Sequence, residues 1–327
     1  MPTFTRRQLI LATTGFTASL AGFGPAFAQT LATPIRVILP VSAGSGLDTI
    51  ARAGQNALSK QLTQPVVIEN LPGAGGIIGT GNLVKAPADG RTIAFVSNNH
   101  SVNPSVYRKM PFDSLKDITP ICVIGETPFL LVVNPAKLPV KNAKELQAAL
   151  KAKPDYYNYA SSGNGTIIHL AAEMFLDAAD VKAGHIPYKG MGGMVTDIIS
   201  GQVDFGVVAI NVAQQHLKNG SLRAVGVMGA MRIASVPDIP TFKEQGFNDM
   251  EVGGWFAVVA PKGLPPAEVT RLHKAIVAAW NTAEVKEAMA KQENIVHPMT
   301  PEASAQFMKS EQARYARIVQ KADIKLD

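Results

Sequence analysis

The sequence predicts an α/β protein with two lobes, each built on a mainly parallel β-sheet flanked by helices, and a cleft between the lobes. Three observations support this prediction. Apolar strand-like runs alternate with amphipathic helix-like runs from residue 35 onward, which is typical of α/β folds. A second series of the same kind begins at Lys141. In each series a glycine- and serine-rich loop follows an apolar strand-like run, at residues 40–48 and 161–166.

The first series has the order βαβαβ. Its short strands are almost continuously apolar, which favours a parallel sheet covered on both faces. The predicted elements are strands at 35–39, 66–69 and 92–96 and helices at 48–62 and 77–85. Residues 103–120, rich in Pro and Asp, are expected to form a loop. This loop leads into strands at 121–125 and 129–134, which we interpret as the first crossing between the lobes.

The second series continues the alternation until Pro237-Asp238-Ile239-Pro240 breaks it. Its predicted helices are 141–153, 167–178, 194–200 and 212–218, and its predicted strands are 156–160, 185–188, 203–208 and 222–227. A strand at 255–260 then returns the chain to the first lobe. Helices at 267–281, 283–291 and 301–322 are expected to cover that lobe, and Pro265-Pro266 suits the start of the first of them. The predicted lobes are 29–124 plus 250–327, and 125–249.

The first 28 residues have the features of a cleavable export signal. Arg6 and Arg7 precede an apolar stretch from Leu9 to about Phe23, and Ala26-Phe27-Ala28 resembles a cleavage site. Polar and glycine residues interrupt the stretch, which makes it too weak for a membrane anchor of about 20 apolar residues. The paired arginines fit the twin-arginine route, but ordinary secretory signals also carry two basic residues. We therefore expect a periplasmic protein and leave both export routes open.

Charge and composition exclude several classes of function. The formal net charge is +6, and Arg6 and Arg7 of the export signal account for two of these charges. No Lys/Arg run exceeds two residues, so a nucleic-acid partner is not expected. Cys122 is the only cysteine and cannot form an intramolecular disulfide. The six histidines include no pair at i,i+4, so neither a metal site nor a cofactor is expected.

The two glycine loops predict an anion-binding site. A loop without bulky side chains at the carboxyl end of a strand exposes backbone N–H groups, and the following helix adds about half a positive charge at its start. Loops of this kind that face each other across a cleft would hold an anion from both sides. The sequence of each loop is equally compatible with plain turn and helix-capping roles.

Nine motifs in order resemble the substrate-binding receptors of tripartite tricarboxylate transporters, also called the Bug family. They are PVSAGSGLD at 40–48, ENLPGAGG at 69–76, Asn103-Pro104 with Tyr107, PFD at 111–113, YASSGNG at 159–165, HLAAE at 169–173, PYKG at 187–190, GQVD at 201–204 and APKG at 260–263. The resemblance implies a type II periplasmic binding protein fold. It also implies a carboxylate ligand held largely by backbone amides and bridging waters of the two loops.

The sequence departs from the family pattern at three positions. Ser45 and Leu47 stand where the family usually has a second glycine and a threonine, and Val208 stands where an aspartate is common. The loss of that acidic group argues against a ligand with an amino group. A more apolar site favours an aromatic or aliphatic acid.

The candidate ligand-binding residues lie in the two loops and at nearby strand ends. They are Ser42, Ala43, Gly44, Ser45, Gly46, Asp48, Asn99, Ser161, Ser162, Gly163, Asn164, Thr166, His169, Tyr188, Lys189 and Val208. A carboxylate beside a bound carboxylate would repel it, so Asp48 is expected to cap the helix and tie the loop amides. His169 could contact the ligand or be a packed core residue, and Lys189 could supply a mobile charge or simply be solvated.

Three functions remain open from the sequence. The first is a receptor that delivers a small carboxylate, a di- or tricarboxylate or an aromatic acid, to membrane permease subunits. The second is a receptor that reports to a sensor kinase. The third is an exported hydrolase with a Ser162–His169 pair, but no Gly-x-Ser-x-Gly elbow is present and no Asp is clearly placed to orient the histidine. The chain is therefore expected not to be an enzyme.

Overall fold

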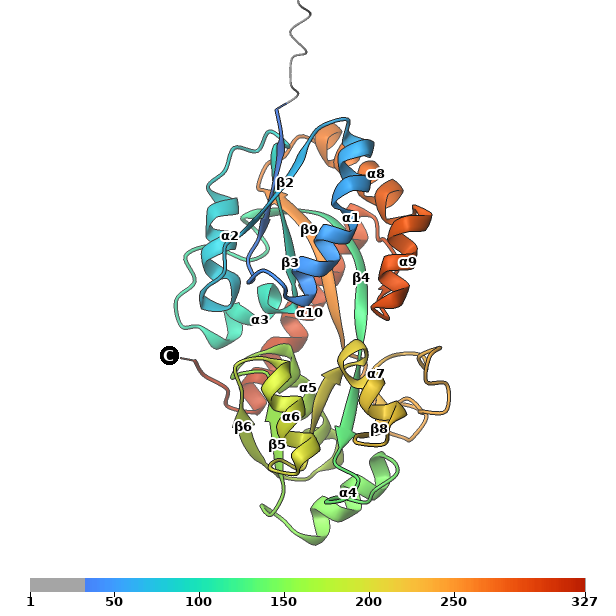
Figure 1. Ribbon diagram of the computed structural model, residues 1–327. Helices are drawn as coiled ribbons and strands as arrows, with labels where there is room; N and C mark the ends of the chain where they lie inside the picture. Colours follow the sequence, from blue (N-terminus) through green and yellow to red (C-terminus); the bar gives the residue numbers. More distant parts are fainter. Residues whose placement is uncertain (1–32, 327) are drawn as a thin grey trace, which may run out of the picture. The chain divides into compact units, whose positions relative to one another are not determined.

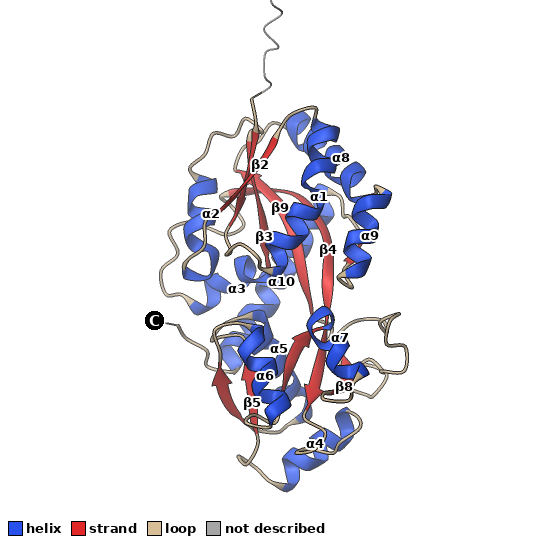
Figure 2. Ribbon diagram, viewed as in Figure 1, coloured by secondary structure: helices blue, strands red, loops and turns tan. Residues whose placement is uncertain are grey.

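In the computed structural model, which describes residues 33–326, ten strands pair into one sheet (Figures 1 and 2). The main strand order is β2-β1-β3-β9-β4-β7-β5-β6, and β8 and β10 also pair with β4. The strands are β1 (Ile35–Leu39), β2 (Val66–Asn70), β3 (Thr92–Ser97), β4 (Ile118–Val133), β5 (Asn158–Ser161), β6 (Gly184–Pro187), β7 (Phe205–Ala209), β8 (Arg223–Val227), β9 (Gly253–Pro261) and β10 (Ile295–Val296). The export signal predicted at residues 1–28 lies outside the described residues.

The sheet is mixed and not mainly parallel, because β4 and β9 pair antiparallel with their neighbours. Helices flank the sheet, so the predicted α/β class is confirmed. They are α1 (Gly46–Leu62), α2 (Ile77–Val84), α3 (Asn98–Val106), α4 (Ala143–Ala152), α5 (Ile167–Ala179), α6 (Met191–Ser200), α7 (Ile210–Lys218), α8 (Pro266–Trp280), α9 (Ala283–Lys291) and α10 (Pro301–Lys321), with a 3-10 turn η1 (Ala74–Gly76). No helix within residues 33–326 combines the length and the apolar character that crossing a bilayer requires.

In the first sheet region, strands β1 and β3 are largely buried on both faces, as their apolar sequences predict, whereas the edge strand β2 exposes Val67. β1 pairs in parallel with β2 on one side and β3 on the other. Val37 and Leu39 pack into a core with α1 and α8, whereas Ile38 points to the opposite face and packs with Leu83 of α2. Successive residues of a strand face opposite sides of a sheet, so a continuous apolar run is needed here.

The crossing between the two sheet regions is one continuous strand, not two. We expected strands at 121–125 and 129–134, but β4 continues through Gly125 to Pro128, and these residues pair with β9. β10 also pairs with β4 at Gly125, where an added Cβ would lie 2.1 Å from the backbone oxygen of Ile295. Glycine at 125 thus permits close pairing and is not a strand break.

The second region contains the other half of β4 and the predicted βα units. Residues Phe129–Val133 of β4 lie between β7 and β8, antiparallel to both, whereas β5 pairs in parallel with β6 and β7. Leu130, Phe205 and Ile168 share one core cluster. The contacts within residues 33–326 join the two regions into one compact unit. The lobe boundaries at residues 124–125 and 249–250 therefore stay a prediction.

Helix α3 corrects the expectation of a loop from residue 103. It is a nine-residue helix whose inward face is polar, since His100, Ser101 and Asn103 are buried. His100 Nε2 lies 2.7 Å from the backbone oxygen of Ser114, and Asn103 Nδ2 donates to the backbone oxygen of Gly75 at 3.0 Å. Val102 and Val106 are the only aliphatic residues of α3, and both are buried. Two apolar positions among buried polar ones are too weak a periodicity to reveal a helix.

Helix α10 packs against both sheet regions, whereas we expected it to cover the first lobe alone. Met308 joins the core beside β3 and β9, and Tyr315 joins the core beside β5 and β7. The Tyr315 hydroxyl accepts hydrogen bonds from Asn98 Nδ2 at 2.9 Å and Trp255 Nε1 at 3.2 Å, and donates to the carboxyl of Glu311. This buried network links α3, β9 and α10.

Candidate functional site

Two loops at strand ends contain most of the candidate binding residues. The first loop is residues 40–48, between β1 and the first turn of α1, and the second loop is residues 161–166, between β5 and α5. Each loop delivers the chain into a helix, so both end at a helix N-terminus (Figure 1). Backbone N–H groups in the first turn of a helix have no partner within the helix.

The first loop is open to solvent at its tip. Ser42, Ala43, Gly44 and Gly46 are exposed, and no atom lies within 4 Å of a Cβ placed on Gly44 or Gly46. Gly44 has φ +79°, a conformation that L side chains rarely adopt. The loop can therefore present main-chain groups without a side chain in front of them.

Ser45, not Asp48, is the N-cap of α1. Its Oγ accepts the Asp48 N–H at 3.4 Å. Asp48 is 3% exposed, and it accepts hydrogen bonds from the Gly44 N–H, Arg52 Nε and Asn70 Nδ2, each at 2.9 Å. Burial alone would raise the pKa of Asp48, but these hydrogen bonds outweigh it and hold the pKa below 3.8. The expected tie between Asp48 and a loop amide is present, whereas the expected capping role belongs to Ser45.

The second loop is held by its own hydroxyl groups. Thr166 is the N-cap of α5, accepting the His169 N–H at 3.3 Å, and its hydroxyl donates to the Gly163 backbone oxygen at 2.8 Å. Ser161 is fully buried, and its Oγ lies 3.2 Å from both the N–H nitrogen and the backbone oxygen of Gly163. Ser162 Oγ donates to Thr166 Oγ1 at 3.1 Å. Asn164, at the tip, is exposed.

At both helix starts, main-chain N–H groups have no described acceptor; Gly46 is exposed, whereas Leu47, Ile167 and Ile168 are buried. The hydrogen bonds described for residues 33–326 include none donated by the N–H groups of Gly46 and Leu47 in α1, or of Ile167 and Ile168 in α5. Since a helix start also carries a partial positive charge, these donors are suited to a carboxylate or another anion.

His169 is buried behind the second loop. It is 5% exposed, and its Nδ1 accepts the Gly165 N–H at 3.2 Å. Burial, reinforced by the neighbouring His185, lowers the pKa of His169 to about 3. His169 is therefore a packed, neutral imidazole bonded to the loop, and its contact with a ligand stays a prediction.

The remaining candidate residues differ in their exposure to solvent. Lys189 is exposed, and Tyr188 is half-buried with its hydroxyl donating to Asp197 Oδ2 at 2.7 Å. Burial and the Asp197 carboxylate raise the pKa of Tyr188 to about 12. Asn99 is partly exposed in the first turn of α3. Val208 is fully buried in β7, opposite Leu130 of β4.

Contacts through α3 connect the surroundings of the two loops. On the first-loop side, a Cβ on Gly79 would lie 2.8 Å from Pro40 Cα, and Asn103 of α3 bonds the nearby Gly75. At the last residue of α3, the Leu326 N–H donates to the Val106 backbone oxygen at 3.1 Å. The Leu326 side chain lies 3.0 Å from a Cβ placed on Gly165 of the second loop. The role of α3 as a bridge could not be predicted from the sequence.

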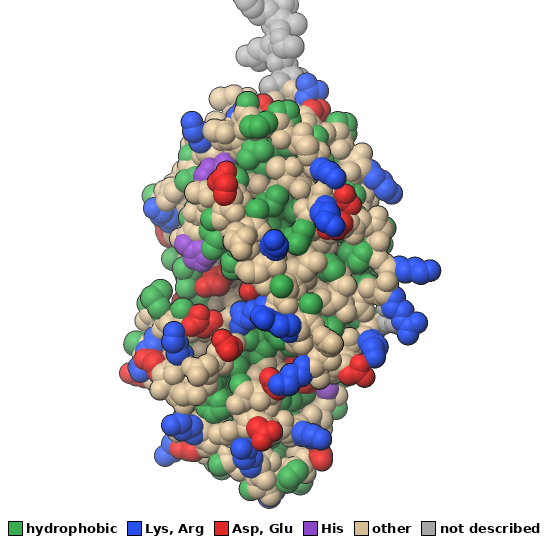
Figure 3. Space-filling view, turned by 180° about the vertical axis from the view of Figure 1, so that it is seen from behind, with side chains coloured by type: hydrophobic (Ala, Val, Ile, Leu, Met, Phe, Trp, Pro, Cys, Tyr) green, Lys and Arg blue, Asp and Glu red, His purple; other side chains and the backbone are tan. Residues whose placement is uncertain are grey.

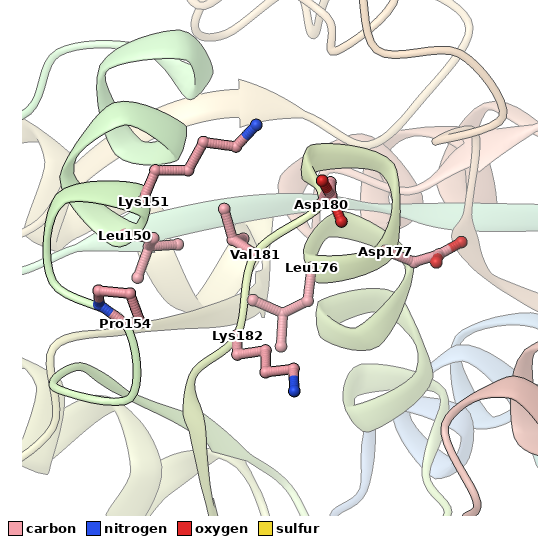
Figure 4. A pocket seen from close by; sticks show the side chains of 8 residues that line it. All are labelled: Leu150, Lys151, Pro154, Leu176, Asp177, Asp180, Val181 and Lys182. Atoms are coloured by element: carbon pink, nitrogen blue, oxygen red, sulfur yellow. The ribbon is translucent and has the colours of Figure 1, made fainter.

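Two cavities are resolved away from both loops. One, of about 520 Å³, lies between the ends of α4 and α5 (Figure 4). It is lined by Leu150, Lys151, Pro154, Leu176, Asp177, Asp180, Val181 and Lys182. The other, of about 320 Å³, is lined by residues of α8 and the start of α10. Neither contains a candidate binding residue, so the cleft between the loops stays a prediction.

The described residues offer little for metal or thiol chemistry. Within residues 33–326, no group of three or more His, Cys, Asp or Glu side chains could hold a metal ion. Cys122 is buried, and burial raises the pKa of its thiol to about 12, so it is not a reactive thiolate. Basic and acidic side chains are interspersed over the face shown in Figure 3, without a continuous basic field.

Comparisons with known proteins identify a matching family. The model of the tripartite tricarboxylate transporter family receptor matches residues 50–324. Protein BugT of Bordetella pertussis is 34% identical over 97% of this chain and 98% of its own. The structure of MatC from Rhodopseudomonas palustris with bound malate has a TM-score of 0.75 at 28% identity, over 88% of this chain and 98% of that one. An R. palustris protein with adipate has a TM-score of 0.79 at 29% identity, over 90% and 99%.

Proposed function

The chain belongs to the tripartite tricarboxylate transporter receptor family, and from this premise we propose that it binds a small organic carboxylate between its first and second loops for delivery to a membrane permease. The family and the fold are those of transporter substrate-binding proteins, which places the protein outside the cytoplasm. Export through the Sec or twin-arginine route belongs to the proposal.

The observation that carries the proposal is the pair of helix starts whose first main-chain N–H groups have no acceptor described within residues 33–326. Gly46 and Leu47 offer N–H groups at one loop, and Ile167 and Ile168 at the other. Hydrogen bonds to a charged group contribute about 1.5–3 kcal/mol each. Three or four of them must offset an association cost of about 4–15 kcal/mol. A micromolar affinity, about −8 kcal/mol, is consistent with these magnitudes.

The ligand class follows from the donors and from Val208. Because the donors are main-chain amides and His169 is neutral, the site selects for negative charge without a buried cation of its own. Related structures contain malate and adipate, which supports a dicarboxylate. The buried Val208 provides no carboxylate for a ligand amino group, which supports an aliphatic or aromatic acid over an amino acid.

Titration calorimetry of the protein with malate, adipate, citrate, benzoate and glutamate tests the proposal. We expect micromolar binding of at least one acid and none of glutamate. A protein that binds none of the acids would contradict the proposed function. Binding to a sensor kinase instead of permease subunits would favour the signalling alternative, and a pull-down with each partner separates the two.

Gly163→Ala tests whether the second loop forms the site. Gly163 has φ +138°, and an added Cβ would lie 3.3 Å from the Tyr188 backbone oxygen, so alanine must shift the loop. We expect affinity to fall at least about tenfold. Gly220→Ala is the matched control, since Gly220 also has positive φ (+75°) but has no atom within 4 Å of its Cβ position. Equal affinities of both variants would place the ligand elsewhere.

A further inference from the structure

Two histidines from different elements stack behind the second loop. The rings of His169 in α5 and His185 in β6 lie 3.8 Å apart between centroids at an interplanar angle of 15°. Tyr159 of β5 continues the stack on His185, at 4.8 Å and 16°. The Tyr159 hydroxyl donates to the Glu173 carboxyl one turn further along α5. The stack therefore fills the space between α5 and the strands β5 and β6.

Each histidine bonds a different part of the second loop. His169 Nδ1 accepts the Gly165 N–H at 3.2 Å. His185 Nε2 lies 2.7 Å from Ser161 Oγ, and Ser161 Oγ accepts the Gly163 N–H at 3.2 Å. Both glycines with positive φ, Gly163 at +138° and Gly165 at +68°, are thus held through the histidine pair.

The bond from Gly165 requires a particular state of His169. A ring nitrogen that accepts an N–H carries no proton, so in the neutral ring the proton is on Nε2. That nitrogen lies 3.9 Å from Glu173 Oε1. Burial keeps both rings neutral by lowering the pKa of His169 and of His185. A neutral acceptor adds no charge to the loop, which separates its role from that of an anion-binding cation.

We propose that His169 and His185 are positioning residues that determine which main-chain N–H groups of the second loop face the ligand. The bond to His169 turns the Gly165 N–H away from the ligand, and the Ser161–His185 bond does the same for the Gly163 N–H. The N–H groups of Asn164, Ile167 and Ile168 are left for the ligand. This inference rests on the proposed function, because it explains how the second loop is prepared for a carboxylate.

Two substitutions of His169 separate an acceptor role from a packing role. His169→Asn keeps an oxygen acceptor near the position of Nδ1 but removes the stacked ring. His169→Phe keeps a planar ring on His185 but removes the acceptor. We expect the affinity for malate or adipate, whichever binds the unmodified protein, to fall about tenfold in His169→Phe and about twofold in His169→Asn. His216→Asn, at a half-buried position in α7, is the control and should bind as the unmodified protein does.

Measurements on the ligand-free protein keep this test independent of the ligand. Amide hydrogen exchange of Gly165 should accelerate at least about tenfold in His169→Phe and remain slow in His169→Asn. Nitrogen-15 spectra of the unmodified protein should show His169 protonated at Nε2. If the unmodified protein binds no acid, the proposed function fails. The Gly165 exchange rates and the His169 tautomer still test the positioning role. A proton on Nδ1, or equal exchange of Gly165 in both variants, would overturn the inference.

Discussion

Removal of the Asp48 carboxylate should destabilise the protein more than removal of any exposed carboxylate. Asp48 is 3% exposed and accepts hydrogen bonds from Gly44, Arg52 and Asn70. Arg52 is 45% exposed at its side chain, so water can replace its partner. The Gly44 N–H and the Asn70 amide lose hydrogen bonds to a charged group, worth about 1.5–3 kcal/mol each. Water at the exposed Gly44 offsets part of this loss, so Asp48→Ala should lower the free energy of unfolding by about 2–4 kcal/mol.

Urea unfolding at pH 7 measures this loss. Asp48→Asn keeps the volume and one acceptor but removes the charge, so its loss should be about half as large. Asp89→Ala is the control, because the Asp89 side chain is 45% exposed and accepts the Arg91 N–H within a surface turn. If Asp48→Ala unfolds at the same urea concentration as Asp89→Ala, the carboxylate does not hold the first loop and the reasoning fails.

The pH dependence of the free energy of unfolding gives a second test of the role of Asp48. Its pKa is held below 3.8 in the folded protein. The stability that it contributes is therefore fully present above that value and is lost as pH falls through the folded pKa. Asp48→Asn should show a shallower loss of stability below pH 3.8 than the unmodified protein. Ligand affinity should also fall in Asp48→Ala, because the freed Gly44 no longer keeps the first loop in place.

Three further changes test the packing and the buried polar groups. Burial lowers the pKa of His100 from 6.5 to about 4, so between these pH values the unfolded chain binds a proton that the folded chain does not. Acidification through this range should lower the free energy of unfolding by on the order of 3 kcal/mol. In urea unfolding, the difference in stability between pH 7 and pH 4.5 should be smaller for His100→Gln than for the unmodified protein. Gly54→Ala would place a Cβ 2.3 Å from Trp280 Cη2, and calorimetric melting should show a loss of about 1–3 kcal/mol. Tyr315→Phe leaves the Asn98, Trp255 and Glu311 partners of the hydroxyl buried and unpaired. Urea unfolding should show a free energy of unfolding lower by about 2–4 kcal/mol. An unchanged unfolding midpoint would mean that the network does not stabilise the protein.

Patterns within one element were sufficient to predict most of the fold. The run from Ile35 to Leu39 is a buried parallel strand, and the second loop ends where Thr166 caps α5, because apolar runs and capping residues act locally. The start of α1 was predicted two residues late. An aspartate in the first turn resembles a cap, and only the geometry shows that Ser45 occupies the cap position.

Features that depend on distant partners were not predictable. Gly125 and Pro128 resemble a strand break, and they continue β4 because β9 and β10 pair with them. Helix α3 has a buried polar face, whose partners come from residues far along the chain. His169 stacks on His185, which is contributed by a separate strand. Spacing along one segment carries no information on such contacts.

The continuity of β4 constrains how the two sheet regions can move. Residues 125–128 are hydrogen-bonded along β9, so rotation of one region against the other must be absorbed as twist distributed over a paired ribbon. A ribbon of this kind resists torsion elastically, unlike a flexible linker that permits free swivelling. Helix α10, anchored in both regions, adds a second resistance in parallel. When an imposed rotation is released, the twist of β4 and β9 should return the two sheet regions to their original relative orientation.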